Sequence, residues 1–446
     1  MIVILHGWSD ASTSFEPLAR TLAELGLRSQ VRRIFLGDYV SMDDDVTFDD
    51  IVVAMQRAWR EAKLPTGARS VDLVVHSTGA LVARYWMTRF FRPDTNPIHR
   101  LLMLAPANFG SPHAHKGLSF LGRVVKGYKA KRLFHTGRQI LRGLEMASAF
   151  TWDLARTDRF DPKQRWYGRD RVLATVLVGT KGYSGIAAAA NTPGSDGTVL
   201  VSTANLDPSY MRFDFATTPE APTLEILSPN GATAFCRIPR ENHSTIARKD
   251  GNFANPVTPT LIAAALTVDD AGFDAHLAEL SRINAEHRRE EAATPYTHGY
   301  QNTVFRVDDN HGAMVPDYFI EAFARTADDR DEDAAVTAKI QNDIIASVQI
   351  NQVFSSFRAI KINCDRLQTL LIDRNRPLNL RITASPEFGE TGSVGYNTLD
   401  YHATGSLRID VGELGRIFRP DRTLLAQLVI RRHIADSLVS FRDAPD

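Results

Sequence analysis

The chain has 446 residues, of which 43% are hydrophobic, and its formal net charge is +0 at pH 7. This length exceeds one ordinary domain, so we expect two domains with cores of their own. The balanced charge argues against general binding of nucleic acid, and no stretch approaches the ~20 apolar residues that span a bilayer. Because the chain begins directly in a core strand, we expect no signal peptide and a cytoplasmic location, with export by another route as the alternative.

The first predicted element is a buried strand over residues 1–5, which His6, Gly7 and Trp8 follow at once. Residues 48–60 predict a helix, with acidic residues in the first turn, where the helix dipole favours them. Further apolar runs alternate with helical patterns along the first half of the chain. This alternation predicts a mostly parallel sheet with helices on both faces.

The run from Val71 to Arg84 is the most informative part of the sequence. A β-branched apolar strand reaches Ser77, and a helix that begins with small residues leaves it. This is the setting of a nucleophile elbow, in which the serine stands on a strained turn and the first N–H groups of the helix face the reacting carbonyl. The motif G-x-S-x-G lacks its first glycine here, since Val75 takes that place. Taken alone, the pattern fits an N-cap serine equally well.

Residues 106–170 form a long insertion between predicted sheet strands. From Lys116 to Arg142 the insertion carries basic residues and no acidic one, and apolar residues at roughly helical spacing follow. This pattern predicts a helical cap that covers a pocket, with peripheral contact with anionic lipid as an extension of that role. The alternative is a solvated basic face on a packed helical segment.

Two later segments supply an acid and a base. Asp196 lies among small residues in a turn after the apolar strand 172–178, and His243 lies in a loop after the short strand 234–236. A serine nucleophile needs a base that takes its proton, and the base needs a carboxylate that fixes its tautomer. Each of these residues is a weak signal alone, but the three occur in the order Ser, Asp, His.

With these motifs, the chain resembles an α/β-hydrolase of the bacterial lipase and esterase kind. The resemblance covers residues 1–260 and implies a minimal sheet that starts at the His-Gly strand. It implies that Ser77 is the nucleophile, Asp196 the acid and His243 the base. It also implies that the backbone N–H groups of Trp8 and Thr78 form the oxyanion hole.

Other titratable residues fit these roles less well. The side chain of His76 diverges from that of its neighbour Ser77, and His6 is better placed to shape the oxyanion loop. Three histidines in the insertion fall outside the family order, and three carboxylates are alternative acids in poorer positions. These residues are His113, His115, His135, Asp38, Asp207 and Glu241.

The pattern divides the chain into a catalytic domain at 1–270, a helical connector at 271–298 and a second domain at 299–446. Short strands with turn signals fill the second domain and predict an accessory antiparallel β-sandwich. Its acidic run at 328–333 is a solvated hairpin loop or, alternatively, a calcium site. The two cysteines fall in different predicted domains, which argues against a disulfide and favours a reducing compartment.

The sequence thus predicts a serine hydrolase that cleaves a carboxylic ester, expected to be lipid-like, through an acyl-enzyme on Ser77. We expect no cofactor, no metal and no nucleic-acid partner; the oligomeric state is open. The alternatives are an acyltransferase with the same triad and a non-catalytic binding or assembly protein on a hydrolase scaffold.

Overall fold

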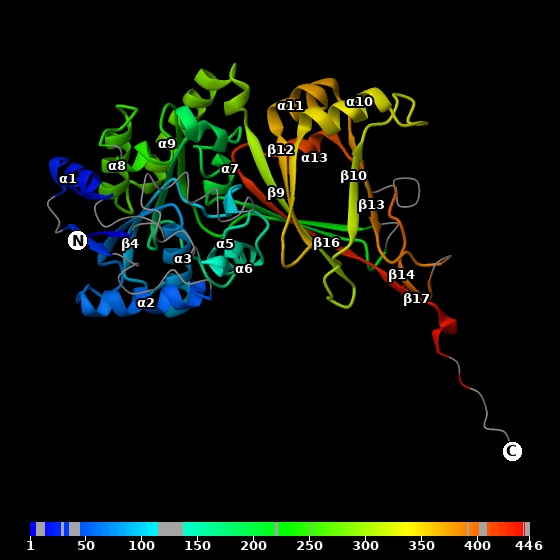
Figure 1. Ribbon diagram of the computed structural model, residues 1–446, viewed down its shortest axis with the longest axis horizontal. Helices are drawn as coiled ribbons and strands as arrows, with labels where there is room; N and C mark the ends of the chain where they lie inside the picture. Colours follow the sequence, from blue (N-terminus) through cyan, green and yellow to red (C-terminus); the bar gives the residue numbers. More distant parts are fainter. Residues whose placement is uncertain are drawn as a thin grey trace. The chain divides into compact units, whose positions relative to one another are not determined.

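The computed structural model describes residues 1–5, 14–27, 31–34, 45–114, 137–218, 222–249, 251–389, 392–400, 408–439 and 441. The chain divides into two compact units (Figure 1). The first unit contains residues 1–208, 228–300 and 421–423, and the second contains residues 209–227, 301–420 and 424–446. The chain therefore passes between the units several times rather than at one boundary.

The first unit is built on a six-stranded sheet with the strand order β2-β1-β3-β4-β5-β8. Every neighbouring pair in it is parallel. The order reverses at β1, whose two neighbours lead to opposite edges, and ligands bind at such switch points in open parallel sheets. The strands are β1 Ile2–Leu5, β2 Val31–Ile34, β3 Val71–His76, β4 Ile98–Leu104, β5 Leu173–Gly179 and β8 Ala234–Ile238.

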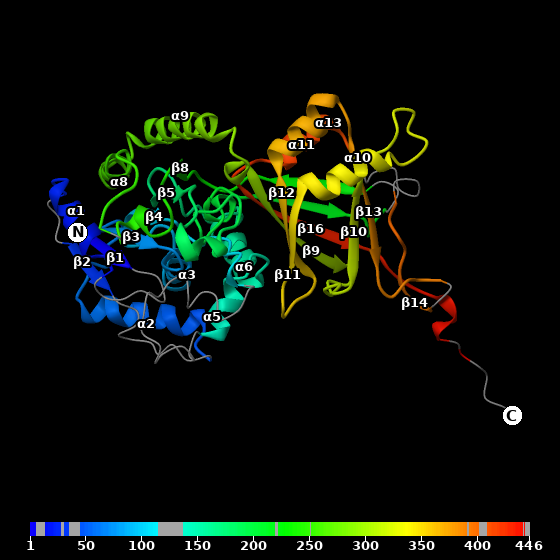
Figure 2. The ribbon, with the colours of Figure 1, turned by 45° about the horizontal axis from the view of Figure 1, so that its top comes forward.

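Helices cover both faces of this sheet, as the parallel connections require. Helices α8 and α9 lie on one face, and α2 and α3 lie on the other (Figures 1 and 2). Helix α2 begins with a capping box between Thr47 and Asp50 and buries one apolar face. The helices are α1 Glu16–Glu24, α2 Phe48–Glu61, α3 Gly79–Phe90, α5 Arg138–Gly143, α6 Ala149–Asp158, α7 Val201–Ala204, α8 Thr258–Thr267 and α9 Phe273–Glu291.

The second unit contains a six-stranded sheet in the order β11-β12-β9-β16-β6-β7 and a three-stranded antiparallel sheet in the order β10-β13-β15. Strands β14 and β17 pair separately. The strands are β6 Ser209–Asp214, β7 Thr223–Leu227, β9 Tyr300–Asp309, β10 Tyr318–Phe323, β11 Ile345–Ile350, β12 Phe357–Asn363, β13 Leu378–Ala384, β14 Val394–Tyr396, β15 Arg408–Ile409, β16 Thr423–Ile430 and β17 Arg432–Ile434. The helices are α10 Ala334–Lys339, α11 Cys364–Leu370 and α13 Val411–Ile417.

The two larger sheets of the second unit pack against each other. One buried cluster joins Val307 of β9 and Leu428 of β16 to Tyr318 of β10 and Ile382 of β13, so it draws on both sheets. The expected combination of a parallel α/β sheet, a helical insertion and a second domain with antiparallel strands is confirmed. In the six-stranded sheet of the second unit, β11 and β12 pair antiparallel, as do β6 and β7, whereas β16 and β6 are parallel.

The expected domain boundaries at 270 and 299 differ from this division. Residues 209–227, placed in the first domain by the sequence pattern, contribute β6 and β7 to the second unit. Residues 271–298, expected as a connector, belong to the first unit, where α9 packs along β8. Sequence patterning missed both points because long-range strand pairing and helix docking leave no local signature.

The acidic run at 328–333 has protein partners in the structure. Asp333 caps helix α10 and forms an ion pair with Arg376, and Asp329 accepts a hydrogen bond from Arg325. Across the described ranges, no group of three or more His, Cys, Asp and Glu side chains is placed to hold a metal ion. Among the helices that the structure describes, none combines the length and the apolar character needed to cross a bilayer.

Candidate active site

Ser77 occupies the turn that joins β3 to α3. The strand ends at His76 and the helix begins at Gly79, so the change of direction falls on Ser77 and Thr78. Ser77 has a φ of 55°. That left-handed conformation costs a residue with a side chain roughly 1–2 kcal/mol, and such strain is typical of functional turns. The half-buried Ser77 follows a strand that borders the switch point of the sheet.

His243 lies within hydrogen-bonding distance of both Ser77 and Asp196. Its Nε2 is 3.1 Å from the Oγ of Ser77, and its Nδ1 is 2.9 Å from Oδ2 of Asp196. A carboxylate only accepts hydrogen bonds, so Nδ1 carries the proton in this arrangement. Nε2 of the neutral imidazole is then free to accept the hydroxyl proton of Ser77. The structure thus brings together three side chains that lie far apart in the sequence.

The loop around Asp196 fixes its carboxylate. Asp196 is fully buried, and its Oδ1 accepts the backbone N–H groups of Thr198 at 2.9 Å and Val199 at 2.8 Å. The main-chain carbonyl of Asp196 accepts the N–H of His243 at 3.0 Å. These bonds hold one carboxylate oxygen within the loop and leave the other oxygen directed at the imidazole, which is the orientation that a triad acid needs.

His76 contacts the loop of His243 from the turn at Ser77. It is buried, and its Nε2 donates to the main-chain carbonyl of His243 at 2.9 Å. The two imidazole rings lie 4.6 Å apart, and Phe15 lies on another side of His76 at 5.6 Å between ring centroids. This hydrogen bond connects the turn at Ser77 to the loop of His243. The contact is suited to positioning that loop and not to taking a proton from Ser77.

The first residues of the insertion link the turn at Ser77 to the loop of Asp196. The N–H of Ala107 donates to the carbonyl of Ser77 at 3.2 Å. The hydroxyl of Ser111 donates to the carbonyl of Thr198 at 2.6 Å, and Nε2 of buried His113 donates to the carbonyl of Gly197 at 2.8 Å. Sequence reasoning set His113 aside as a base but missed this positioning contact. Its signal was a pair of polar residues in an otherwise small and apolar segment.

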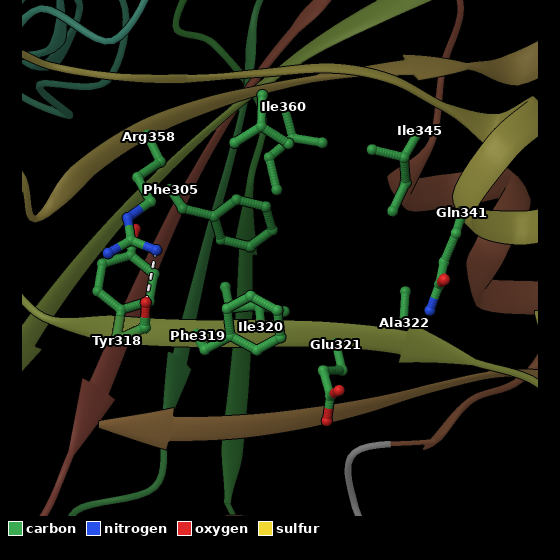
Figure 3. A pocket seen from close by; sticks show the side chains of 11 residues that line it. Phe305, Tyr318, Phe319, Ile320, Glu321, Ala322, Gln341, Ile345, Arg358 and Ile360 are labelled. Carbon is green, nitrogen blue, oxygen red and sulfur yellow. Dashed lines mark hydrogen bonds between the residues drawn. The ribbon is translucent and has the colours of Figure 1, made fainter. Parts of the chain in front are cut away.

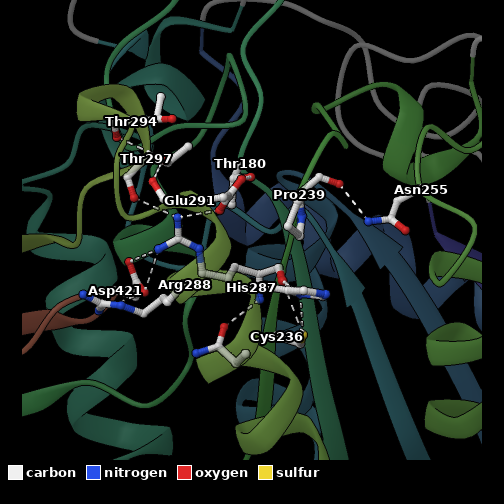
Figure 4. Close-up of polar contacts among 12 residues, drawn as sticks. Thr180, Cys236, Pro239, Asn255, His287, Arg288, Glu291, Thr294, Thr297 and Asp421 are labelled. Atoms are coloured by element: carbon white, nitrogen blue, oxygen red, sulfur yellow. Dashed lines mark hydrogen bonds and ion pairs between the residues drawn. The ribbon is translucent and has the colours of Figure 1, made fainter.

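A buried ion cluster anchors strand β8, which leads to the loop of His243. Arg237 is 1% exposed, and its guanidinium contacts the carboxylates of Glu291 at 2.8 Å and Asp421 at 3.2 Å. It also donates to the carbonyl of Thr297 at 2.8 Å, and Figure 4 shows Glu291, Thr297 and Asp421 grouped at this position. Burial lowers the pKa of Arg237, but the charges of Asp421 and Glu291 outweigh it, so the pKa lies above its ordinary value.

The alternative acids have partners other than His243. Glu241 is fully buried and accepts hydrogen bonds from the N–H of Asn255 at 2.9 Å and the hydroxyl of Thr258 at 2.6 Å. Asp207 forms an ion pair with Arg422. Asp38 lies outside the described residues. Among the carboxylates that can be placed, Asp196 is therefore the one that contacts the imidazole.

The predicted oxyanion hole can be followed on one side. Thr78 is buried and helical in conformation, and its backbone N–H donates to no acceptor within the described ranges. An N–H group at the start of a helix is suited to hold a developing negative charge. Trp8, the second predicted donor, and His6 lie outside the described residues, so their roles stay predictions.

The described part of the insertion at 106–170 contains two helices, α5 and α6. Helix α5 packs against α2 and helix α6 against α3, and Phe150 stacks on Phe48 with ring centroids 4.3 Å apart. Residues 115–136, which include His115, His135 and most of the basic run, lie outside the described part of the chain. The place of the insertion as a cap over Ser77 stays a prediction.

No protein-family model and no curated protein sequence matches the chain. Its fold is similar to that of phospholipase PlaB from Legionella pneumophila. The complex of PlaB with thio-NAD is 23% identical with a TM-score of 0.82, and the match covers 100% of this chain and 97% of that one. A second PlaB structure is also 23% identical with a TM-score of 0.82, over 99% of this chain and 96% of that one. The likeness spans both units, so the chain has an α/β-hydrolase fold with an added unit of β-sheets.

Proposed function

We propose that the protein is a serine hydrolase that cleaves carboxylic esters of lipids through an acyl-enzyme on Ser77. The observation that carries the proposal is the pair of hydrogen-bonding contacts that connect Ser77 to His243 and His243 to Asp196. Ser77 itself has the strained backbone conformation. A nucleophile, a base and an orienting acid within hydrogen-bonding distance are the requirements of acyl transfer to serine. An ordinary N-cap serine would require none of these partners.

The first step transfers the acyl group to Ser77. The hydroxyl oxygen attacks the ester carbonyl carbon while Nε2 of His243 takes the hydroxyl proton, and Asp196 stabilises the resulting imidazolium. The N–H of Thr78 holds the negative charge on the carbonyl oxygen, with Trp8 as the second donor that the family resemblance implies. When the tetrahedral intermediate collapses, the ester C–O bond breaks, and His243 gives its proton to the departing alcohol.

The second step returns the free enzyme. His243 takes a proton from a water molecule, whose oxygen attacks the acyl carbon of the Ser77 ester. The bond between the acyl carbon and the Oγ of Ser77 then breaks, and the serine regains its proton from His243. The products are a carboxylic acid and the alcohol released in the first step. An acyltransferase would use a second alcohol in place of water.

One comparison supports a lipid as the ester: PlaB, whose fold this chain shares, is named a phospholipase. The thio-NAD in the PlaB complex makes a dinucleotide a ligand to test, since the described residues alone do not indicate one.

The test combines labelling and turnover. A fluorophosphonate should label the wild-type chain but not Ser77→Ala, because only an activated serine reacts with it. Ser77→Ala should also lower hydrolysis of phospholipid vesicles and of a soluble ester by a factor on the order of 10⁴ to 10⁶. A folded Ser77→Ala protein with wild-type turnover would refute the nucleophile assignment. Hydrolysis of the soluble ester alone would refute the lipid part and keep the serine hydrolase.

A further inference from the structure

The second unit contains a cavity of about 470 Å³ between its two larger sheets (Figure 3). This volume falls within the range of roughly 300–1,000 Å³ that is typical of small-molecule sites. Its walls come from strands β9, β10, β11 and β12. They are mainly apolar, with the side chains of Phe305, Ile320, Ile345, Val348 and Ile360 on several sides.

The cavity lies between two sheet edges. Strand β10 is the edge of the three-stranded sheet, and β11 is the edge of the six-stranded sheet. Phe319 on β10 is 61% exposed and Val348 on β11 is 54% exposed, and both line the cavity. Apolar side chains at the rim show that the cavity opens to solvent and that its entrance is itself suited to a hydrocarbon chain.

One end of the cavity carries a positive charge. Arg358 stacks over the ring of Tyr318, with its central carbon 3.8 Å from the ring centroid. Its guanidinium donates to the carbonyls of Tyr318, Pro316 and Ser355, and it forms no ion pair with any residue that the structure describes. A guanidinium carries more N–H donors than these carbonyls accept, and carbonyls do not neutralise its charge. Arg358 can therefore also bind an anion.

The acidic residue of the cavity has a cationic partner of its own. Glu321 forms an ion pair with Arg381 at 3.0 Å, and Arg381 also contacts Asp400 at 2.8 Å, so this group keeps a net negative charge. Arg358 is the cation among the described lining residues, and it has no ionic partner in the described part of the chain. An apolar cavity with one cationic end matches a ligand that has a hydrocarbon chain and a single anionic head.

We propose that this cavity binds a long-chain carboxylate, with the chain between β10 and β11 and the carboxylate on Arg358. The ligand class follows from the cavity itself. Its source rests on the proposed function, since hydrolysis of a lipid ester releases such an acid. The cavity belongs to the second unit and is a separate site from the line of Ser77, His243 and Asp196.

The experiment measures binding of decanoate to the full-length Ser77→Ala protein by calorimetry, which keeps turnover out of the readout. Val348→Trp places an indole at the rim and should weaken decanoate binding at least tenfold. Ile350→Trp is the matched control because Ile350 lies on the same strand, is 44% exposed and does not line the cavity. We expect the Ile350→Trp variant to bind decanoate with an affinity within about twofold of that of the Ser77→Ala protein. Ile350 lies outside the proposed contact with the ligand.

Arg358→Gln tests the head group. It should weaken decanoate binding about tenfold while leaving the affinity for decanol within about twofold, because only the anion uses the charge. Arg374→Gln, an exposed arginine of the same unit, is the control for a general change in charge. Circular dichroism and thermal unfolding establish that each variant is folded.

Equal decanoate affinity in Val348→Trp and Ile350→Trp would overturn the site, and equal loss of decanoate and decanol in Arg358→Gln would overturn the carboxylate. Absence of decanoate binding would overturn the proposal. If the Val348→Trp protein also showed a changed sedimentation coefficient, the cavity would be an interface between copies of the chain. Decanoate binding in a protein that hydrolyses no ester would refute the proposed function alone.

Discussion

The two units differ in how deeply the ion pairs compared below are buried. In the first unit, Arg84 and Asp158 form an ion pair whose side chains are both 0% exposed, and Arg237 is almost as deeply buried between its two carboxylates. In the second unit, Arg381 is 35% exposed beside its carboxylates. Removing one partner of a buried ion pair leaves an uncompensated charge and strongly destabilises the fold. Removing one partner of an exposed pair costs little, because water screens the remaining charge.

The buried pairs of the first unit join segments that are distant in the sequence. Asp158 of α6 accepts hydrogen bonds from Arg84 of α3 and from Tyr167, which fixes the end of the insertion on the helix that follows Ser77. Loops that have to meet at one reaction centre require such fixed supports. The second unit instead leaves an open apolar cavity between two strand edges, and a cavity of this kind suits binding rather than the positioning of reacting groups.

The largest expected effect is at Asp196, the proposed acid. Asp196→Asn should lower ester turnover roughly 10⁴-fold, because an amide can donate to Nδ1 and stabilise the wrong tautomer of His243. Asp207→Asn is the matched control, since Asp207 pairs with Arg422, and we expect its turnover to stay within about threefold of wild type. The measurement is kcat on a soluble ester. Equal losses of turnover in the two variants would show that Asp196 is not the acid that orients His243.

The second prediction concerns the buried ion pair. Arg84→Met should destabilise the first unit by about 3–5 kcal/mol, because it leaves Asp158 charged and buried without its partner. The five tryptophans all lie between residues 8 and 166, so their fluorescence during urea unfolding reports on the first unit.

Arg381→Met is the counterpart in the second unit. Because its ion pairs are partly exposed, we expect a loss of about 1 kcal/mol or less, measured by hydrogen exchange of β13. A loss from Arg381→Met as large as that from Arg84→Met would contradict the contrast between the two units.

Two glycines allow a smaller comparison of packing. Gly110 and Gly312 have φ values of 87° and 80°. A Cβ at Gly110 would lie 2.6 Å from the carbonyls of Leu144 and Glu145, whereas a Cβ at Gly312 meets nothing within 4 Å. Gly110→Ala should therefore cost about 2–4 kcal/mol from strain plus overpacking, and Gly312→Ala about 1–2 kcal/mol from strain alone. Thermal unfolding followed by tryptophan fluorescence checks the former, and hydrogen exchange near β9 checks the latter. Similar losses of stability in the two variants would show that the backbone around Gly110 shifts to relieve the close contact.

The smallest effect is a pH dependence. Burial lowers the pKa of His276, whose Nε2 lies 3.0 Å from the hydroxyl of Thr175. The unfolded chain then binds more protons than the folded chain, so stability is present above the ordinary pKa of 6.5 and is lost as the pH falls through that value towards the lower folded pKa. In His276→Gln, this part of the pH dependence should be absent from urea unfolding followed by tryptophan fluorescence.

His433 of the second unit is the matched site. Burial also lowers the pKa of His433, but its surroundings are more exposed, so His433→Gln should change the pH dependence less than His276→Gln does. A larger effect at His433, measured by hydrogen exchange of β17, would contradict the view that the second unit screens its charges with water.

The sequence by itself determined the local elements and the chemistry of the candidate site. Periodicity predicted a helix at 48–60, which is α2 over Phe48–Glu61, and the apolar run at 1–5 predicted a strand, which is β1 over Ile2–Leu5. Helix and strand periods are local, so a short window contains the whole signal. The order Ser77, Asp196, His243 and the turn at Ser77 were likewise visible: each residue is a weak signal alone, but the three follow successive predicted strands in that order.

Only the tertiary structure decided what joins distant parts of the chain. It paired β6 with β16 and docked α9 on β8, and it placed His113 on the carbonyl of Gly197. It also left a cavity between the edges of two sheets, with Arg358 at one end. Pairing, docking and cavity formation depend on which surfaces remain after the local elements have formed. Their free energy comes from contacts between residues that are far apart in the sequence, which no local pattern records.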